Sequence, residues 1–379
     1  MPSTIFRLLA AAIALLQLVA AFATSSYARG FDSEQALGQA LFQDKNLSAD
    51  RTVACASCHQ ADHAFSDSRP ISVGVAGQHG TRNAPSLLEI GEYTSFFWDG
   101  RATTLDEQVH LTVLSAVECG FSTPGQVIAR VKQNPRYVNA FRALDKGSPS
   151  ALKLSDISHA IVAYERTLIA PPNNLDRYLA GNHSSLSLAA QKGLAVFRGK
   201  ADCTSCHLIS GQSASLTDNQ FHSSGVGLAA VTPALAHLAA EVAHLSQAER
   251  FQKIASDPQI AALGRYVVTL DPKDIGAFRT PSLRNVALTA PYMHDGSIPT
   301  LAQAVDIELY YRGLALGHPI LFTSAEKQEL LAFLQSLSSE PSRKSAAVFN
   351  ERARQAEPMS EVRRVAAGRH SDAQARRQP

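Results

Sequence analysis

The chain has 379 residues and 45% of them are hydrophobic, so it is long enough for two ordinary domains that each bury a core of their own. The formal net charge of +2 is too small to argue for nucleic acid or an anionic membrane surface as a partner.

The first 28 residues have the pattern of a secretory signal peptide. Arg7 is followed by the apolar run LLAAAIALLQLVAAF and then by small-residue sites at Ala23 and Ala28. Because the run is short and cleavage-type residues follow it, a permanent membrane anchor is the weaker interpretation. We expect a mature chain that starts near Arg29 and resides in the periplasm, an oxidising compartment, without a membrane anchor.

The sequence contains the pattern CxxCH twice. It reads CASCH at 55–59 and CTSCH at 203–207, which leaves Cys119 as the one cysteine outside the two motifs. Zinc sites and long-range disulfides do not need a histidine directly after each cysteine pair. Covalent haem needs all three residues, because two cysteines on one helical face form thioethers and the histidine binds the iron. The motifs therefore predict two haem c groups, one held by Cys55, Cys58 and His59 and the other by Cys203, Cys206 and His207.

The expected helices follow in chain order. A short amphipathic helix and a loop precede the first CxxCH, and a longer helix covers 154–169 with Ser155 as its N-cap. The sequence APPNN at 170–174 ends that helix and marks a domain boundary. A helix and a loop at 186–207 then repeat the arrangement that precedes the first motif. The stretch from about 229 to 262 has helical spacing and predicts an inserted helical pair.

Sustained alternation of apolar and polar residues is missing from the sequence. The predicted fold class is therefore all-α, with two cytochrome c-like haem domains at 29–170 and 171–339 and with long loops. From 340 to 379 the chain carries nine Lys or Arg against five Asp or Glu, and its apolar periodicity fades. We interpret this segment as a disordered basic tail, with a docking role as the less favoured alternative.

Several long motifs resemble the bacterial dihaem cytochrome c peroxidases. They include RNAPSL, FFWDGRATTLDEQ and GAFRTPSLRNVALTAPYMHDGSIPTLAQAV, and the match runs from about 35 to 338. They look closest to the branch of MauG, which matures methylamine dehydrogenase, and of the related methanobactin-associated dihaem enzymes. The resemblance implies that hydrogen peroxide reacts at the N-terminal haem domain and that the C-terminal domain transfers electrons.

For the first haem, the resemblance places the distal histidine position of the classical peroxidases on Val75. A permanently accessible, high-spin iron is therefore expected, and His79 is interpreted as a solvated loop residue in preference to a ligand. The family register also implies Glu118 as the group that moves protons between the peroxide oxygens, with Gln108 as a polar orienter. The alternative is that Glu118 and Gln108 merely face solvent.

The loop between Gln108 and Glu118 departs from the family, because the prolines usual there are missing. This departure leaves the shape of the loop open, with His110 as an alternative residue that approaches the iron. Cys119 is interpreted as a small buried hydrophobe, with a reactive thiol as the alternative.

Trp98 is the only tryptophan and lies where the family places the aromatic residue between its haems. The resemblance implies that its indole shortens the electron path, and a role as a core aromatic is the alternative. The side chain of Asn83 and the backbone carbonyls of Thr289 and Pro291 match the family's calcium site. Amide and carbonyl oxygens suit this hard cation.

The distal ligand of the second haem separates the branches of the family. Classical peroxidases use methionine, but Met293 lies off the ligand position. An ungapped count forward from His294 reaches Glu308, whereas a count back from Arg312 and Gly313 reaches Tyr310 and requires a gap of two extra residues in VDIELYYRG. We prefer Tyr310, with Glu308 and Tyr311 as alternatives, because phenolate is an established haem ligand and the MauG-like branch uses tyrosine.

Three functions are compatible with these features. The first is MauG-like oxidation of a partner protein, driven by hydrogen peroxide and by long-range electron transfer. The second is a cytochrome c peroxidase that reduces hydrogen peroxide with electrons from a small cytochrome c or a cupredoxin. The third is a dihaem electron carrier without catalysis, which would have two six-coordinate irons and no use for Glu118.

Overall fold

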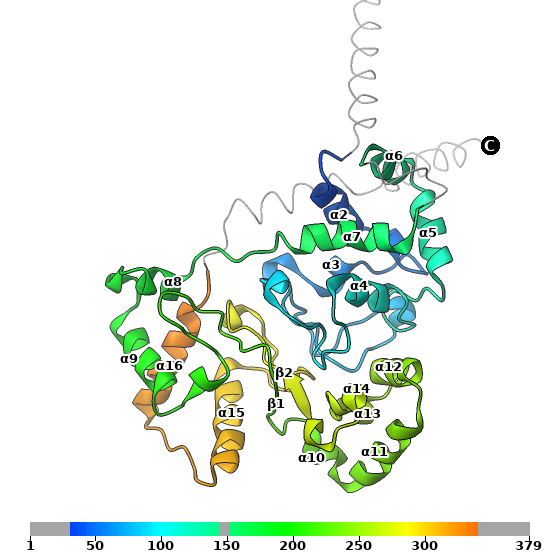
Figure 1. Ribbon diagram of the computed structural model, residues 1–379. Coiled ribbons are helices and arrows are strands. Elements are labelled where there is room, and N and C mark those ends of the chain that lie inside the picture. Colours follow the sequence, from blue (N-terminus) through cyan, green and yellow to red (C-terminus); the bar gives the residue numbers. More distant parts are fainter. Residues whose placement is uncertain (1–30, 145–151, 340–379) are drawn as a thin grey trace, which may run out of the picture. The chain divides into compact units, whose positions relative to one another are not determined.

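The computed structural model describes residues 31–144 and 152–339, and within them the chain is mainly helical (Figure 1). The predicted signal peptide and the predicted basic tail lie outside these residues. The helices are α2 Glu34–Gln43, α3 Cys55–Cys58, α4 Leu105–Val113, α5 Pro124–Lys132, α6 Pro135–Ala143, α7 Leu154–Glu165, α8 Asn174–Leu179, α9 Leu188–Arg198, α10 Leu228–Val231, α11 Leu235–His244, α12 Gln247–Ser256, α13 Pro258–Ala262, α14 Tyr266–Thr269, α15 Leu301–Leu316 and α16 Ser324–Ser336. The expectation of a mainly helical fold is confirmed.

The few strands form one small sheet. β1 Phe221–Ser223 and β2 Ala277–Arg279 are antiparallel, and Phe221 pairs with Arg279. The rest of the described chain consists of short 3-10 turns and long loops. Among the described residues, no helix is both long enough and apolar enough to span a lipid bilayer.

The starts of the helices follow from short polar side chains. Ser33 caps α2 by accepting a hydrogen bond from the backbone N–H of Ala36 at 3.1 Å. The predicted N-cap of α7 is wrong, because the helix begins at Leu154 and includes Ser155. The carboxylate of Asp156 accepts a hydrogen bond from the backbone N–H of Lys153 at 2.8 Å and takes over the capping.

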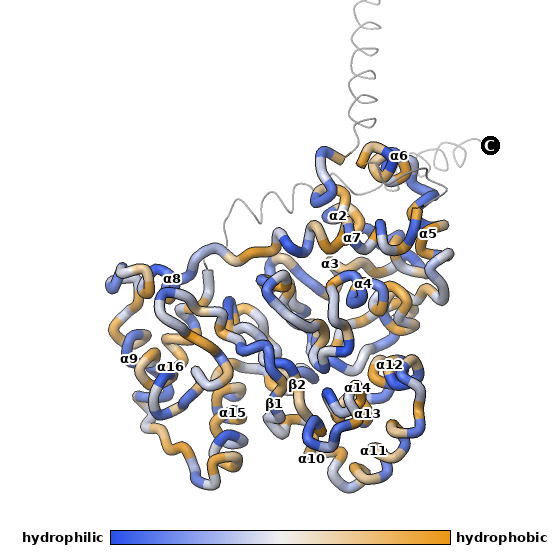
Figure 2. The backbone as a smooth tube through the Cα atoms, viewed as in Figure 1, coloured by the Kyte–Doolittle hydropathy of each residue, from blue (hydrophilic) through white to orange (hydrophobic). Residues whose placement is uncertain are grey.

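Three hydrophobic clusters form the core. The first contains buried residues between 37 and 168, the second residues between 175 and 337, and the third lies within helices α10 to α14 and the residues around them. Along the helices of all three clusters, hydrophobic and hydrophilic residues alternate, as expected of helices that bury one side (Figure 2). The two larger clusters lie on either side of residue 170 in the sequence, whereas the division into two haem domains stays a prediction.

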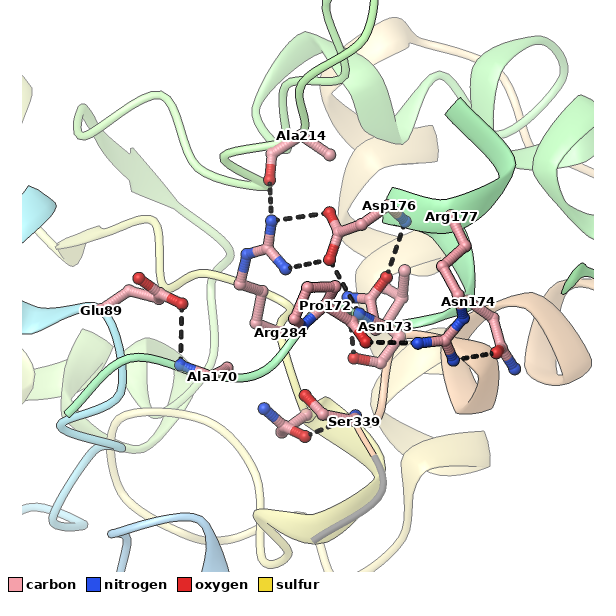
Figure 3. A network of polar contacts seen from close by, with 12 residues as sticks. Glu89, Ala170, Pro172, Asn173, Asn174, Asp176, Arg177, Ala214, Arg284 and Ser339 are labelled. Atoms are coloured by element: carbon pink, nitrogen blue, oxygen red, sulfur yellow. Dashed lines mark hydrogen bonds and ion pairs between the residues drawn. The ribbon is translucent and has the colours of Figure 1, made fainter. Parts of the chain in front are cut away.

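The segment after α7 is fixed by polar contacts (Figure 3). The backbone N–H of Ala170 donates to Glu89 at 3.0 Å. Further on, Asp176 accepts two hydrogen bonds from the guanidinium of Arg284, at 2.7 and 2.9 Å. Asn173 also donates to the carbonyl oxygen of Leu337 at 3.1 Å. This segment is therefore anchored both to the loop of Glu89 and to Arg284 and Leu337, which follow the second CxxCH motif in the sequence.

The helix before each CxxCH motif packs closely on a later helix through a glycine. α2 contacts α7 at Gly38, where an added Cβ would lie 1.7 Å from the carbonyl oxygen of Ala160. α9 contacts α16 at Gly193, where an added Cβ would lie 1.9 Å from the carbonyl oxygen of Glu329. Both distances are far below a van der Waals contact, so each pair of backbones approaches as closely as glycine alone permits.

We expect the substitution Gly193→Ala to destabilise the protein by ~1–3 kcal/mol or more, because α9 and α16 must separate to admit the methyl group. The measurement is urea unfolding of the haem-loaded protein. Gly125→Ala is the matched control, since the atom nearest to its added Cβ is a threonine hydroxyl at 3.9 Å. Equal stability of the two variants would contradict the close packing of α9 on α16.

Candidate active site

The first CxxCH motif borders a cavity. α3 is a single helical turn that begins at Cys55 and ends at Cys58, so both thiols lie on one face and both line this cavity. The Nδ1–H group of His59 donates to the carbonyl oxygen of Phe65 at 3.0 Å, which leaves Nε2 for a metal. Burial lowers the pKa of His59, which favours the neutral imidazole that binds iron.

The second CxxCH motif borders a second cavity, and its residues Cys203–Ser205 form a 3-10 turn where the first motif forms an α-helical turn. Cys203, Cys206 and His207 line this cavity, and the Nδ1–H group of His207 donates to the carbonyl oxygen of Leu216 at 2.9 Å. Burial lowers the pKa of this histidine too. Each cavity thus offers two thiols and one oriented imidazole nitrogen among mostly apolar side chains, and this donor set fits a covalently bound haem.

The predicted proton-transfer group lies in the first cavity. Glu118 and Gln108 both line it, together with Thr112, whose hydroxyl accepts a hydrogen bond from the Gln108 amide at 3.1 Å. Burial raises the pKa of Glu118, while the positive charge of Arg101 opposes this shift. A carboxyl group in this cavity is positioned to exchange a proton with a small molecule bound beside it.

The loop that carries Glu118 is held by backbone hydrogen bonds in place of prolines. The N–H of Val75 donates to the carbonyl oxygen of Glu118 at 3.1 Å, and the N–H of Ala49 donates to that of Cys119 at 2.8 Å. The glycine-rich segment of Val75 therefore supports the loop of Glu118, whereas Val75 itself is buried outside the cavity lining.

The other candidates near the first cavity occupy different surroundings. His79 is exposed and is not part of the cavity lining. His110 also lies outside the lining, and its Nε2 atom is 3.1 Å from the hydroxyl of Ser158 on α7. Cys119 is buried and lines the cavity, and burial raises the pKa of its thiol, which favours the protonated form.

A second carboxyl group in the first cavity was not predicted from the sequence. Glu165, the last residue of α7, lines the cavity and is only 4% exposed, and its Oε2 atom has no hydrogen-bond partner. Burial, with a smaller contribution from the negative charge of Asp106, raises the pKa of Glu165 to about 8. The helical spacing could have revealed it, because Ile157, Ile161 and Glu165 recur every four residues on one face.

The raised pKa of Glu165 makes the stability of the protein depend on pH. Between about pH 5 and pH 8 the folded state keeps a proton on Glu165 that the unfolded state has lost, so the free energy of unfolding falls as the pH rises. We expect wild type to lose a few kcal/mol, to order of magnitude, over this range relative to Glu165→Gln. Urea unfolding of both haem-loaded proteins at pH 5 and pH 8 measures the difference. Parallel pH profiles of the two proteins would show that Glu165 does not keep a proton in the folded state over this range.

Among the residues that the structure describes, two line both cavities. Trp98 is one of them, and its indole N–H donates to the backbone carbonyl of Asn83 at 2.8 Å, while Arg279 of β2 is the other. The side-chain amide of Asn83 donates to the carbonyl oxygens of Arg69 and Pro70, both at 3.1 Å, which leaves its amide oxygen available to a cation.

The candidates for the distal side of the second haem are separated by the structure. Glu308 of α15 lines the second cavity, as do Met293 and His222. Tyr310 is not brought to this cavity; it is 60% exposed and lines a separate hollow beside α15 and α16. Tyr311 also lies outside the lining, and its ring packs against Gly225.

Comparisons with known proteins agree with this site. Residues 32–184 match the model of the family described as di-haem cytochrome c peroxidase. The cytochrome-c peroxidase IdrP1 of Pseudomonas sp. (strain SCT) is 36% identical over 320 residues, which cover 81% of each chain. The methylamine utilization protein MauG of Methylorubrum extorquens is 31% identical over 81% of this chain and 78% of its own.

A solved structure has a similar fold. The crystal structure of a MauG-like protein associated with microbial copper homeostasis superposes with a TM-score of 0.65 at 29% identity, over 82% of this chain and 91% of that chain. The family implies two haem c groups, which the two Cys-Cys-His sites can hold. The chain therefore belongs to the di-haem cytochrome c peroxidase family, and it is a dihaem oxidoreductase.

Proposed function

We propose that hydrogen peroxide reacts at the haem of Cys55, Cys58 and His59 in the fully oxidised protein, and that the second haem relays or stores the electron equivalents. In the first candidate, as in MauG, these equivalents are withdrawn from a residue of a partner protein. One observation carries the proposal. Among the described residues that line the first cavity, His59 is the only histidine, and none is methionine, lysine or tyrosine. The lining therefore offers no second iron ligand of these types, which leaves the iron accessible to peroxide.

The residues of the first cavity supply the proton chemistry. Hydrogen peroxide takes up two electrons and two protons and becomes two water molecules. The haem supplies the electron exchange when it is bound, and the two electrons come ultimately from the partner. Glu118 accepts a proton from one peroxide oxygen and returns it to the leaving oxygen, while Gln108 orients the peroxide. Trp98 borders both cavities and shortens the electron path between them.

A cytochrome c peroxidase is the second candidate. It would reduce hydrogen peroxide with electrons from a small cytochrome c or a cupredoxin. The names of several relatives favour this function, and so does Met293 in the second cavity, because a thioether ligand raises the haem potential and eases electron entry.

The two candidates differ in what oxidised protein does with one equivalent of peroxide. Electron paramagnetic resonance before and after the addition is the test. Loss of the high-spin and low-spin ferric signals without prior reduction, together with no turnover of reduced cytochrome c, supports the MauG-like reaction. Unchanged signals until one haem is reduced, followed by rapid oxidation of reduced cytochrome c, would support the cytochrome c peroxidase and overturn the first candidate.

A calcium site is part of the proposal. We place a calcium ion at the side chain of Asn83 and the carbonyl oxygens of Thr289 and Pro291, a set of hard oxygen ligands. Elemental analysis of wild type and Asn83→Ala tests it, with one calcium expected in wild type and none in the variant.

We also propose that the enzyme resides in the periplasm, which fractionation of cells that express the full chain would check.

A further inference from the structure

Arg279 occupies an unusual position between the two cavities. It is the last residue of β2 and is only 3% exposed, and its side chain contributes to the lining of both cavities. Its backbone N–H donates to the carbonyl oxygen of Trp98 at 2.7 Å, and its Nε–H donates to that of Phe97 at 3.4 Å. The guanidinium carbon lies 3.7 Å from the centre of the Tyr93 ring.

In the part of the chain that the structure describes, the guanidinium of Arg279 has no anionic partner. Among the described residues, no carboxylate lies within 4.0 Å of Arg279, and its buried Nη1 atom has no hydrogen-bond acceptor. The ring of Tyr93 offsets part of the positive charge but accepts no conventional hydrogen bond. Other cavity-lining arginines do have carboxylate partners: Arg82 and Arg101 pair with Asp99, and Arg312 pairs with Asp202.

A buried, unpaired guanidinium is costly, so its position points to an anion that arrives with a ligand. Each haem c carries two propionate carboxylates, and the flat fork of arginine matches a carboxylate. Because Arg279 borders both cavities, it can reach a carboxylate in either of them. We propose that Arg279 is an anion-binding residue shared by the two haem sites, and that it pairs with propionate carboxylates of both haems.

This pairing has an electrical consequence for the enzyme. A positive charge beside both haems favours their reduced forms, so it raises both midpoint potentials together. The inference rests on the two haem c groups of the family and not on the reaction with peroxide. Its test needs no peroxide, so it can fail or succeed independently of the proposed function.

The test is a potentiometric titration of the haem-loaded Arg279→Gln variant, with the two haems distinguished by electron paramagnetic resonance. Both potentials are expected to fall, and to fall further at pH 8 than at pH 5, because propionates that lose Arg279 can take up protons at low pH. Arg312→Gln is the matched control. Arg312 lines the second cavity only, so its substitution should change the potential of the second haem alone.

Arg279→Met tests the same inference if the glutamine variant folds poorly, because an apolar side chain of similar length is better tolerated in a buried position. Haem content and far-ultraviolet circular dichroism establish that each variant is loaded and folded. Potentials equal to those of wild type in a folded variant would overturn the inference. A shift of one haem alone would overturn the shared site and leave Arg279 as a partner of that haem only.

Discussion

Glu118→Gln is expected to slow the reaction of the oxidised protein with hydrogen peroxide by about 10²–10⁴-fold, the usual contribution of a positioned acid-base group. Glutamine keeps the size of the side chain but can neither accept nor return a proton. Glu118 lines the first cavity, and burial raises the pKa of its carboxyl, while the positive charge of Arg101 opposes this shift. Stopped-flow absorption of the haem after mixing with peroxide measures the rate.

The control for this experiment is Glu107→Gln. Glu107 lies in the first turn of α4 outside the cavity lining, where it accepts a hydrogen bond from the backbone N–H of Thr103 at 2.8 Å. Its substitution should leave the peroxide reaction unchanged. A wild-type rate in Glu118→Gln would show that another group moves the proton, and Glu165 in the same cavity would be the next residue to replace.

Glu308→Gln is expected to change the ferric low-spin signal of the second haem and to raise its midpoint potential, on the order of 100 mV. Glu308 lines the cavity of His207, where burial raises the pKa of its carboxyl and the charge of Arg312 opposes this shift. As a ligand of ferric iron the carboxyl would be ionised, and removing this negative charge destabilises the ferric state. Electron paramagnetic resonance and potentiometric titration of the haem-loaded protein measure the two effects. The potential of the first haem should stay close to that of wild type.

Tyr310→Phe is the companion variant. Since the Tyr310 side chain lies outside the second cavity, this substitution should alter neither the signal nor the potential of the second haem. The reverse pattern, with a changed spectrum in Tyr310→Phe and an unchanged one in Glu308→Gln, would restore the tyrosine ligand that the family resemblance favoured. A change in neither variant would direct attention to Met293 and His222.

The distal ligand illustrates what the sequence could not determine. Glu308 and Tyr310 lie two residues apart on the continuous helix α15, and two helical residues span about 200°, so the helix cannot present both to one cavity. Choosing between the two registers from the sequence required a decision about a gap. The structure shows which side of α15 faces the cavity, and this side depends on packing against distant segments.

The two CxxCH motifs could be recognised because their chemistry is local. Two cysteines three residues apart and the next histidine meet on one turn of chain, whatever surrounds them. Arg279 and Glu165 are different, because their significance comes from burial and from one polar atom in each that has no hydrogen-bond partner among the described residues, Nη1 of Arg279 and Oε2 of Glu165. The hydrophobic spacing of α7 points to Glu165, whereas the segment GAFRTPSL has no periodicity that would mark Arg279.

The position of the single tryptophan provides an optical probe of the folded enzyme. Trp98 borders both cavities, and haem absorbs strongly where indole emits, so energy transfer should extinguish its fluorescence in the folded, haem-loaded protein. Because c-type haems stay covalently attached after unfolding, recovered emission would report the separation of the indole from the two haems and not their loss. The chain thus carries an unlabelled reporter at the place where its two cavities adjoin.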